Sequence, residues 1–439
     1  MTMINTHKKK EVGVVGSIAG ASIGTLMQVY DSYIYGAVAV VLSSVIFGSV
    51  KGGLLFTFLA FGLGYLAGPI GSFFFGHLGD KLGRRYSMLI SFWLIGGGTL
   101  FTGFIPSHAS IGIWAPILLY ALRIPVGFGS SGEWGSEGSY LIELGGRTKR
   151  GFYSAFQQFV VVGGLLGGTA TGIIVTGISH EFLYSIGWRI PFIVGGALLI
   201  PIAFVLRMRM PESKSFEEVK EKQEIEKLPS EMVFTRDWKP AILTAFGAIV
   251  WEASFAIMLS YLPTYFATTT TITLHQGLII TTVGTAILMV FIPMWGYISD
   301  KFMGRKKVAM IAAIAYIILP YPLFVVMRGG NFYQALAAVS VLDFFIAPLS
   351  GTLVAWIGEQ FPTNDRASAY IPYFISETVF FGFTGAIITY LINTTHNTLS
   401  PVFIATAAGI VAVICFALMK ETAHLESLPD DKSIYSKES

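Results

Sequence analysis

The stretch GHLGDKLGRR, at residues 76–85, lies between two long apolar runs and concentrates charge in a chain that is only 13% charged. A similar stretch, GYISDKFMGRK, follows at residues 296–306. The glycines of these stretches permit a tight turn and close helix contact, and their charged side chains are costly inside a bilayer. Both stretches are therefore expected to be short loops at one membrane surface, and their recurrence indicates a duplicated chain.

The rest of the chain consists largely of apolar blocks. Of its 439 residues, 53% are hydrophobic, which leaves too little polar surface for a soluble protein of this size. A block of about 20 apolar residues spans a bilayer as a helix. The sequence therefore predicts an all-α membrane protein with twelve transmembrane helices, at 17–42, 55–76, 87–105, 111–138, 152–178, 188–207, 241–266, 276–298, 307–327, 332–358, 370–393 and 400–419.

The basic residues predict how these helices are oriented. Of 29 Lys and Arg, one side of the predicted bundle holds only Lys51, Arg189 and Arg328, and Arg123 lies within a helix. Lys and Arg are in excess in cytoplasmic loops. We therefore expect a multi-pass protein of the cell (plasma) membrane with both termini in the cytoplasm. The first apolar block is too long for a signal peptide.

The duplication extends beyond the charged loops. Similar positions recur at an offset of about 220 residues: Asp31 with Glu252, Gly76 with Gly296, Asp80 with Asp300, Arg123 with Asp343, Glu143 with Glu359 and Arg150 with Arg366. We expect two pseudo-symmetric six-helix halves, at 1–207 and 241–420. A cytoplasmic linker with a short helix, at 208–240, joins them, and 421–439 is a cytoplasmic tail. Such halves, with a site between them near mid-bilayer, are a transporter architecture.

Several motifs resemble those of a known transporter family. GHLGDKLGRR and its echo resemble the signature loop of the major facilitator superfamily, found between helices 2 and 3 and again between helices 8 and 9. The motifs VYDSYIYG (29–36), RIPVGFGSSGEWGSEGSYLIE (123–143), RGFYSAFQQ (150–158), WRIPF (188–192) and MPESKSF (210–216) are similar to those of the metabolite:proton symporters. That family carries small organic acids and zwitterions such as osmolytes. This chain departs from it at Gln28, where an acid is common, and at Ser136 and Glu137, which replace a small pair.

The resemblance implies that the charged loops form a cytoplasmic gate. Asp80 is expected to accept hydrogen bonds at a helix N-terminus of the other half, which carries partial positive charge, and Arg84 to pair with Glu143. The alternative is that the loops only satisfy the charge bias. The predicted gate residues are Gly76, Asp80, Gly83, Arg84, Glu143, Arg150, Asp300, Arg305, Glu359 and Arg366.

Ionisable side chains within the predicted helices are functional candidates, because each costs about 2.5–3.5 kcal/mol at the bilayer centre. They are Asp31, Arg123, Glu133, Glu137, Glu252, Asp343 and Glu377. Asp31 and Arg123 lie at matching depth, and the resemblance implies a proton site; the alternative is a static ion pair. Glu252 and Asp343 occupy the equivalent places, where they share a proton, bind a substrate ammonium or are structural. Glu377 is a second proton site or meets water at the inner end, and Glu133 lies in the inner vestibule or in helix packing.

The substrate cavity is expected between the halves. Adjacent amides in an apolar helix need partners, and the resemblance places Gln157 and Gln158 near substrate. Aromatic residues of membrane helices more often pack or lie at the interface. The cavity candidates are Tyr30, Tyr33, Tyr35, Gln157, Gln158 and Trp251.

Other chemistry is disfavoured. The string GFGSSG, at 127–132, matches a dinucleotide-binding pattern, but no strand precedes it and it lies in a membrane helix, so helix packing is expected. No catalytic or metal-ligand pattern is present. We expect no enzyme activity, no cofactor and no nucleic-acid partner; the expected partners of this monomer are a small solute, protons and the bilayer.

These features predict a proton-coupled symporter that imports a small carboxylate-bearing or zwitterionic solute. One base among six acids disfavours a polyanion such as citrate. The alternatives are a proton-coupled exporter, a passive facilitator of a neutral or cationic solute such as a sugar or drug, and a receptor built on the same scaffold.

Overall fold

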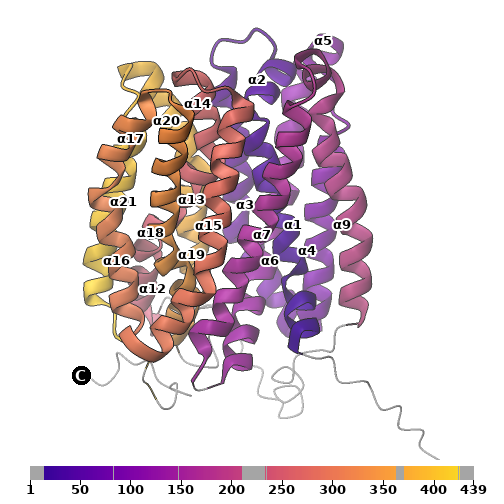
Figure 1. The fold of residues 1–439 in the computed structure, drawn as a ribbon. Helices are drawn as coiled ribbons and strands as arrows, with labels where there is room; N and C mark the ends of the chain where they lie inside the picture. The colour runs from indigo at the N-terminus through magenta and orange to yellow at the C-terminus, as the bar shows by residue number, and fades with distance from the viewer. Residues whose placement is uncertain are drawn as a thin grey trace, which may run out of the picture.

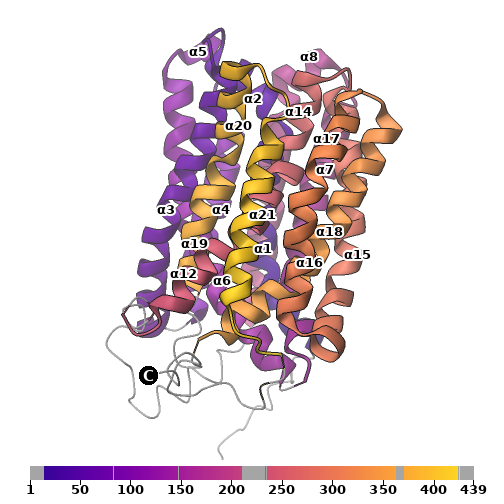
Figure 2. The ribbon, with the colours of Figure 1, turned by 90° about the vertical axis from the view of Figure 1, so that its left-hand side faces the viewer.

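The computed structural model describes residues 14–82, 84–146, 148–209, 233, 235–361, 370–423 and 425. Across these ranges the regular structure is helical and no strand occurs, which confirms the all-α prediction. The long helices run roughly parallel in one bundle, with the N-terminal half (α1–α9) on one side and the C-terminal half (α12–α21) on the other (Figures 1 and 2).

The N-terminal half contains helices whose lengths follow the apolar blocks. They are α1 (Val14–Ala37), α2 (Ala39–Phe47), α3 (Gly53–Leu82), α4 (Arg84–Thr102), α5 (His108–Ile111), α6 (Trp114–Gly145), α7 (Arg150–Thr176), α8 (His180–Phe182), the π-helix η1 (Leu183–Gly187) and α9 (Arg189–Arg209).

The C-terminal half repeats this order with more interruptions. Its helices are α12 (Trp238–Gly247), α13 (Ile249–Phe255), η2 (Ala256–Tyr261), α14 (Leu262–Thr269), α15 (Leu274–Ile298), η3 (Ser299–Met303), α16 (Arg305–Ile318), α17 (Pro320–Arg328), α18 (Phe332–Glu359), α19 (Ile371–Ser376), η6 (Glu377–Phe381), α20 (Gly382–Thr395) and α21 (Ser400–Leu418). Here η2, η3 and η6 are π-helical segments.

The membrane spans agree with the twelve predicted blocks. Within the described residues, seven helices are long and apolar enough to cross a bilayer, and ten are when each of three bent pairs is counted as one span. The remaining two blocks correspond to α4, with the shorter apolar part Leu89–Thr102, and to α6, which carries Arg123, Glu133 and Glu137.

Two blocks that were predicted as single helices, 17–42 and 307–327, are bent, and a third bend lies just before the block 188–207. The chain turns by 69° between α1 and α2, by 46° between η1 and α9, and by 47° between α16 and α17. The last bend has a clear cause, since α17 begins at Pro320 and a proline removes a helical hydrogen bond. In addition, η2 and η6 interrupt the blocks at 241–266 and 370–393.

The halves meet along a few helix pairs. α3 packs along α20, α7 along α15, and α1 against η2 and α14. α9 ends and α12 begins at the same, lower end of the bundle in Figure 1. The expected linker helix, and the tail apart from residues 421–423 and 425, lie outside the described residues.

The glycine-rich string at 127–132 packs as expected. Gly127, on α6, lies against the backbone carbonyl of Gly64 on α3, and a Cβ at this position would overlap that carbonyl. Small residues let membrane helices approach this closely. The string therefore belongs to a helix contact beside the site described next.

Candidate functional site

Asp31 on α1 and Arg123 on α6 form a buried ion pair inside the N-terminal half. Arg123 Nη1 donates to Asp31 Oδ2 at 2.7 Å, and Nη2 donates to Oδ1 at 3.2 Å. The Asp31 side chain is 1% exposed and the Arg123 side chain is 2% exposed. This is the two-point geometry of a strong guanidinium–carboxylate contact. The structure thus brings together the two residues that the sequence predicted as a proton site, and proton coupling remains a prediction.

Neighbouring hydroxyls hold the pair in place. Thr99 Oγ1 donates to Asp31 Oδ1 at 2.7 Å, and Arg123 Nη2 donates to Thr102 Oγ1 at 3.0 Å. The guanidinium also lies 5.1 Å from the ring centre of Tyr35, within cation–π range. Arg123 Nε has no hydrogen-bond partner among the described residues. The arginine therefore keeps one donor for a water molecule or a solute.

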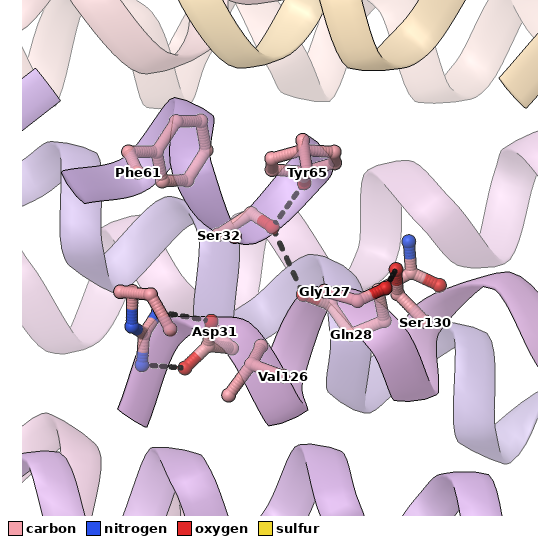
Figure 3. Close-up of a pocket in the computed structure, with 10 residues that line it drawn as sticks. Gln28, Asp31, Ser32, Phe61, Tyr65, Val126, Gly127 and Ser130 are labelled. Atoms are coloured by element: carbon pink, nitrogen blue, oxygen red, sulfur yellow. Dashed lines mark hydrogen bonds and ion pairs between the residues drawn. The ribbon is translucent and has the colours of Figure 1, made fainter. Parts of the chain in front are cut away.

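A small cavity adjoins the ion pair, and we call it the ion-pair cavity. Figure 3 shows residues of α1, α3 and α6 around it. Its volume is about 10 Å³, close to the room that one water molecule needs. Gln28 Oε1, in its wall, is buried and has no hydrogen-bond partner within the described chain. The lining is Gln28, Asp31, Ser32, Phe61, Gly64, Tyr65, Arg123, Val126, Gly127 and Ser130.

A second cavity, the central cavity, lies between the two halves. Its volume is about 30 Å³, and both aromatic rings and acids form its wall. Trp251 stacks on Phe255 at 4.1 Å between ring centres and meets Trp134 edge-on at 6.0 Å. The lining is Gln28, Val29, Ser32, Tyr33, Tyr65, Trp134, Val161, Trp251, Glu252, Phe255, Glu377 and Phe381. A wall of aromatic faces and carboxylates suits a cation.

The three acids that were predicted within the spanning helices of the C-terminal half, Glu252, Asp343 and Glu377, separate into two environments. Glu252 and Glu377 line the central cavity together, and Glu252 Oε1 has no hydrogen-bond partner among the described residues. Asp343 lies elsewhere, with its carboxylate against Gly284 on α15. Neither Asp343 oxygen has a hydrogen-bond partner in the described part of the chain. The acid beside Glu252 at the cavity is therefore Glu377, and not Asp343, the residue equivalent to Arg123.

Buried polar atoms without partners cluster near the central cavity. Gln157 Nε2 donates to the Trp134 carbonyl at 3.4 Å, but Gln157 Oε1 and both polar atoms of the Gln158 amide have no hydrogen-bond partner within the described residues. The same holds for Trp134 Nε1 and the Tyr373 hydroxyl. Buried polar groups are normally hydrogen-bonded, and exceptions call for an explanation. A polar solute that binds here would satisfy them.

The tyrosine candidates face different surroundings. Tyr33 lines the central cavity, as predicted. Tyr30 instead donates its hydroxyl to the Pro191 carbonyl at 2.9 Å, which places it against α9. Tyr35 donates its hydroxyl to the Thr57 carbonyl at 2.7 Å and presents its ring to Arg123. Tyr35 therefore supports the ion pair, and Tyr30 packs between helices.

The second charged stretch, at 296–306, was expected to be a loop but is helical except at Gly304, because η3 continues α15 as far as Met303. It forms a network that joins the halves, and we call this network the inner gate. Asp300 Oδ1 and Oδ2 accept hydrogen bonds from the backbone N–H groups of Gly151 at 2.9 Å and Phe152 at 2.8 Å. These groups belong to the first turn of α7, where a helix carries partial positive charge. Asp300 thus binds a helix N-terminus of the other half. This is the contact that the resemblance implied for Asp80, its equivalent in the first charged stretch.

Arginines complete the inner gate. Arg305 Nη2 lies 2.8 Å from Asp300 Oδ1, and Arg305 donates to both oxygens of Glu359, from Nε at 3.2 Å and from Nη2 at 3.1 Å. Arg150 Nη1 lies 3.8 Å from Glu359 Oε1. The remaining predicted gate positions are outside the described side chains: Gly76, Gly83, Asp80, Arg84, Glu143 and Arg366.

The chain after α21 also takes part in the inner gate, which the sequence did not reveal. Glu421 accepts hydrogen bonds from the backbone N–H groups of Arg305 at 2.9 Å and Lys306 at 3.0 Å, and so caps α16. Thr422 Oγ1 donates to Glu359 Oε2 at 2.6 Å. The only available signal was an acid and a hydroxyl directly after the last apolar block.

Two acids of α6 bind hydroxyls on different helices. Glu133 accepts a hydrogen bond from Ser91 on α4 at 2.7 Å. Glu137 accepts hydrogen bonds from Ser22 and Thr25 on α1. Neither lines the two cavities. The helix-packing interpretation of Glu133 fits this placement.

Known proteins resemble this chain over nearly its whole length. The family model for sugar (and other) transporters matches residues 18–228, and the model of the major facilitator superfamily matches residues 253–434. The chain is 30% identical over 430 residues to the ectoine/proline transporter ProP of Corynebacterium glutamicum, and the match covers 93% of this chain and 84% of that protein. The chain belongs to the major facilitator superfamily.

Other superfamily members extend the comparison. The proline/betaine transporter of Escherichia coli K12 is 28% identical over 422 residues, covering 93% of this chain and 84% of that protein. The citrate-proton symporter of Salmonella typhi is 27% identical over 425 residues, covering 94% and 96%. A partially occluded, inward-open structure of the E. coli xylose transporter XylE has the same fold, with a TM-score of 0.76 at 18% identity over 93% of this chain and 98% of that chain. These relatives are transporters rather than enzymes, as predicted.

Proposed function

We propose that this superfamily member is a proton-coupled symporter that imports a small zwitterionic solute by alternating access. One observation carries the proposal: the buried Asp31–Arg123 pair lines a cavity that shares wall residues with the central cavity, whose walls are aromatic and acidic. The ion-pair cavity and the central cavity share Gln28, Ser32 and Tyr65 as lining residues. A solute in the central cavity therefore lies within reach of the ion pair.

The proton step follows from competition for one guanidinium. A carboxylate on the solute and the carboxylate of Asp31 are alternative partners for Arg123, whose planar fork suits either. When the solute takes the arginine, Asp31 loses its counter-charge in a buried place, where an unpaired charge is costly. Asp31 then binds a proton, and the site that carries both proton and solute is close to neutral. By reciprocity, a higher proton concentration tightens solute binding.

The cationic end of the solute is assigned to the central cavity. Glu252 and Glu377 supply negative charge, and Trp134 and Trp251 supply aromatic faces. A cation over such a face gains about 0.5–2 kcal/mol. Proline, betaine and ectoine, which the relatives' names mention, each combine a cationic nitrogen with a carboxylate. The two acids oppose a polyanion such as citrate.

Alternating access is assigned to the inner gate. Asp300, Arg305 and Glu359 tie the C-terminal half to α7, and breaking these contacts would open the site on their side. We place this side in the cytoplasm of the cell, with both termini, because the basic residues concentrate there. We further propose that the division into halves at 1–207 and 241–420 marks the two moving units, that no cofactor takes part, and that the transporter works as a monomer.

The test is an uptake assay with purified protein in liposomes. Radiolabelled glycine betaine, proline, citrate and xylose are offered with and without an inward proton gradient. We expect glycine betaine or proline to accumulate above equilibrium only with the gradient. Equilibration that ignores the gradient would show a facilitator, and proton-driven loss from the liposomes would show an exporter. Accumulation of citrate or xylose, without accumulation of glycine betaine or proline, would reject the proposal that the substrate is a zwitterion.

A further inference from the structure

The hydroxyl of Tyr65, on α3, bonds next to the ion pair. Tyr65 Oη lies 2.8 Å from Ser32 Oγ, and Ser32 Oγ donates to the Gln28 carbonyl at 3.2 Å. When Ser32 gives its one proton to the Gln28 carbonyl, Tyr65 is the donor in the first of these bonds. Ser32 follows Asp31 directly on α1. A shift of this turn of α1 therefore moves the partner of the Tyr65 hydroxyl.

The ring and backbone of Tyr65 contact the other half. The ring meets Phe381 edge-on at 5.2 Å between centres, and Thr378 Oγ1 donates to the Tyr65 carbonyl at 3.0 Å. Gly382 leaves no room for a Cβ beside the Tyr65 side chain, so the two segments are in close contact. Phe381 and Thr378 belong to η6, the π-helical segment that begins at Glu377.

Tyr65 thus stands between the acids of the two halves. Asp31 and Arg123 share the ion-pair cavity with it, and Tyr33, Glu252 and Glu377 share the central cavity. Tyr65 lines the ion-pair cavity, and its backbone carbonyl accepts a hydrogen bond from Thr378 of η6. π-helical turns are rare, and they occur frequently at functional sites.

We propose that Tyr65 is a positioning residue that transmits the protonation state of Asp31 to η6 and so to Glu377. This deepens the proposed function, on which it rests, by naming the route from the proton site to the substrate acid. When Asp31 is neutral, its bond to Arg123 weakens and the turn carrying Ser32 relaxes. The Tyr65 hydroxyl follows Ser32, and the ring carries the movement to Phe381. Without the hydroxyl the ring still packs, but it no longer follows α1.

The experiment needs no solute. Hydrogen–deuterium exchange is measured by mass spectrometry on the full chain in lipid nanodiscs at one fixed pH, for peptides that cover η6 and α20. Asp31→Asn imitates the neutral acid. We expect it to change the exchange rate of the η6 amides about fivefold, the effect of one hydrogen bond. In a Tyr65→Phe background, the same Asp31→Asn change should have no effect on η6.

A matched control is Tyr120→Phe. Its hydroxyl also joins two helices, α6 and α3, by donating to the Phe56 carbonyl at 2.9 Å, but Tyr120 lines neither cavity. In that background the fivefold effect should persist. Ser32→Ala removes the same bond from the other side and should block the effect as Tyr65→Phe does; it also replaces Tyr65→Phe should that variant not fold.

An equal response of η6 to Asp31→Asn with and without the Tyr65–Ser32 bond would overturn the proposal, and so would no response in the otherwise unaltered protein. Because no solute is present, this result is independent of the uptake assay. A chain that accumulates no zwitterion but shows the Tyr65-dependent response would reject the proposed substrate and keep the coupling route. The reverse outcome would keep the symporter and reject Tyr65.

Discussion

The two halves hold ionisable residues at equivalent positions but use them differently. In the N-terminal half, Asp31 and Arg123 close on each other at 2.7 Å. In the C-terminal half the equivalent residues are Glu252 and Asp343, two acids; the first lines the central cavity and the second lies against Gly284. At these two positions, an acid and a base neutralise each other. Two acids instead need a proton or a cation from outside the protein. The proposed mechanism uses this difference: the first half exchanges the proton, and the second binds the cationic end of the solute.

Removing the acid of the first half should have the largest effect. Asp31→Asn is expected to abolish gradient-driven accumulation of glycine betaine, because no group then exchanges the coupled proton. Exchange of labelled for unlabelled solute at equal concentrations should survive. Glu133→Gln is the matched control: Glu133 is also a buried acid, but it bonds to Ser91 and lines neither cavity, so accumulation should persist. Wild-type accumulation by Asp31→Asn would remove the distinction between the halves.

The inner gate should respond next most strongly. Asp300→Asn weakens two bonds to the α7 N-terminus and the contact with Arg305, and hydrogen bonds to charged groups are worth about 1.5–3 kcal/mol each. We expect the inner side to open more often. Labelling of Ala155→Cys by a membrane-impermeant maleimide, in a Cys415→Ser background, should accelerate about tenfold or more. The control is Lys301→Gln, which removes an exposed charge from the same segment, η3, and should leave the labelling rate unchanged. A similar labelling rate in the two variants would contradict the gating role of Asp300.

The acids of the second half should differ from each other. Glu377→Gln is expected to weaken glycine betaine binding about tenfold, the worth of one charge-assisted bond. Asp343→Asn should change the binding constant far less, because Asp343 does not line the cavity. Isothermal titration on both variants measures this. Equal losses of glycine betaine affinity in the two variants would contradict the assignment of Glu377, rather than Asp343, to the solute site.

The aromatic wall should contribute least. Trp134→Leu removes one cation–π face and is expected to weaken glycine betaine binding about fivefold, from a contribution of about 1 kcal/mol. Trp93→Leu is the control, since that side chain is 53% exposed on the outside of α4. An unchanged binding constant in Trp134→Leu would place the cation elsewhere.

The architecture could be predicted from the sequence because burial in a bilayer demands long apolar helices and leaves few ionisable residues inside them. Against that apolar background, Asp31, Arg123 and the charged loops stand out by residue type alone. The bend between α1 and α2 and the π-helical turns could not be predicted, since hydrophobic composition does not specify where a helix changes its hydrogen bonding.

Within the site, the sequence identified residue types better than contacts. The duplication placed Glu252 and Asp343 at the positions equivalent to Asp31 and Arg123 and so suggested that they are neighbours. A repeat offset gives the depth of a residue and not the face it occupies, so Glu377 was not anticipated as the neighbour of Glu252 at the cavity. Trp134 and Tyr65 were missed for another reason. Aromatic residues are common in membrane helices, and only three-dimensional neighbours distinguish a cavity wall from packing.

The central claim is that a solute binding at the second half causes the first half to take up a proton. Isothermal titration of glycine betaine into the purified protein, in buffers with different ionisation enthalpies at the same pH, counts the protons directly. We predict uptake of about one proton per bound solute in the wild type, as linkage requires when the solute displaces Asp31. Glu377→Gln should bind more weakly and take up the same proton, and Asp31→Asn should bind without proton uptake. Solute binding with no proton uptake in the wild type, or undiminished uptake in Asp31→Asn, would contradict the account.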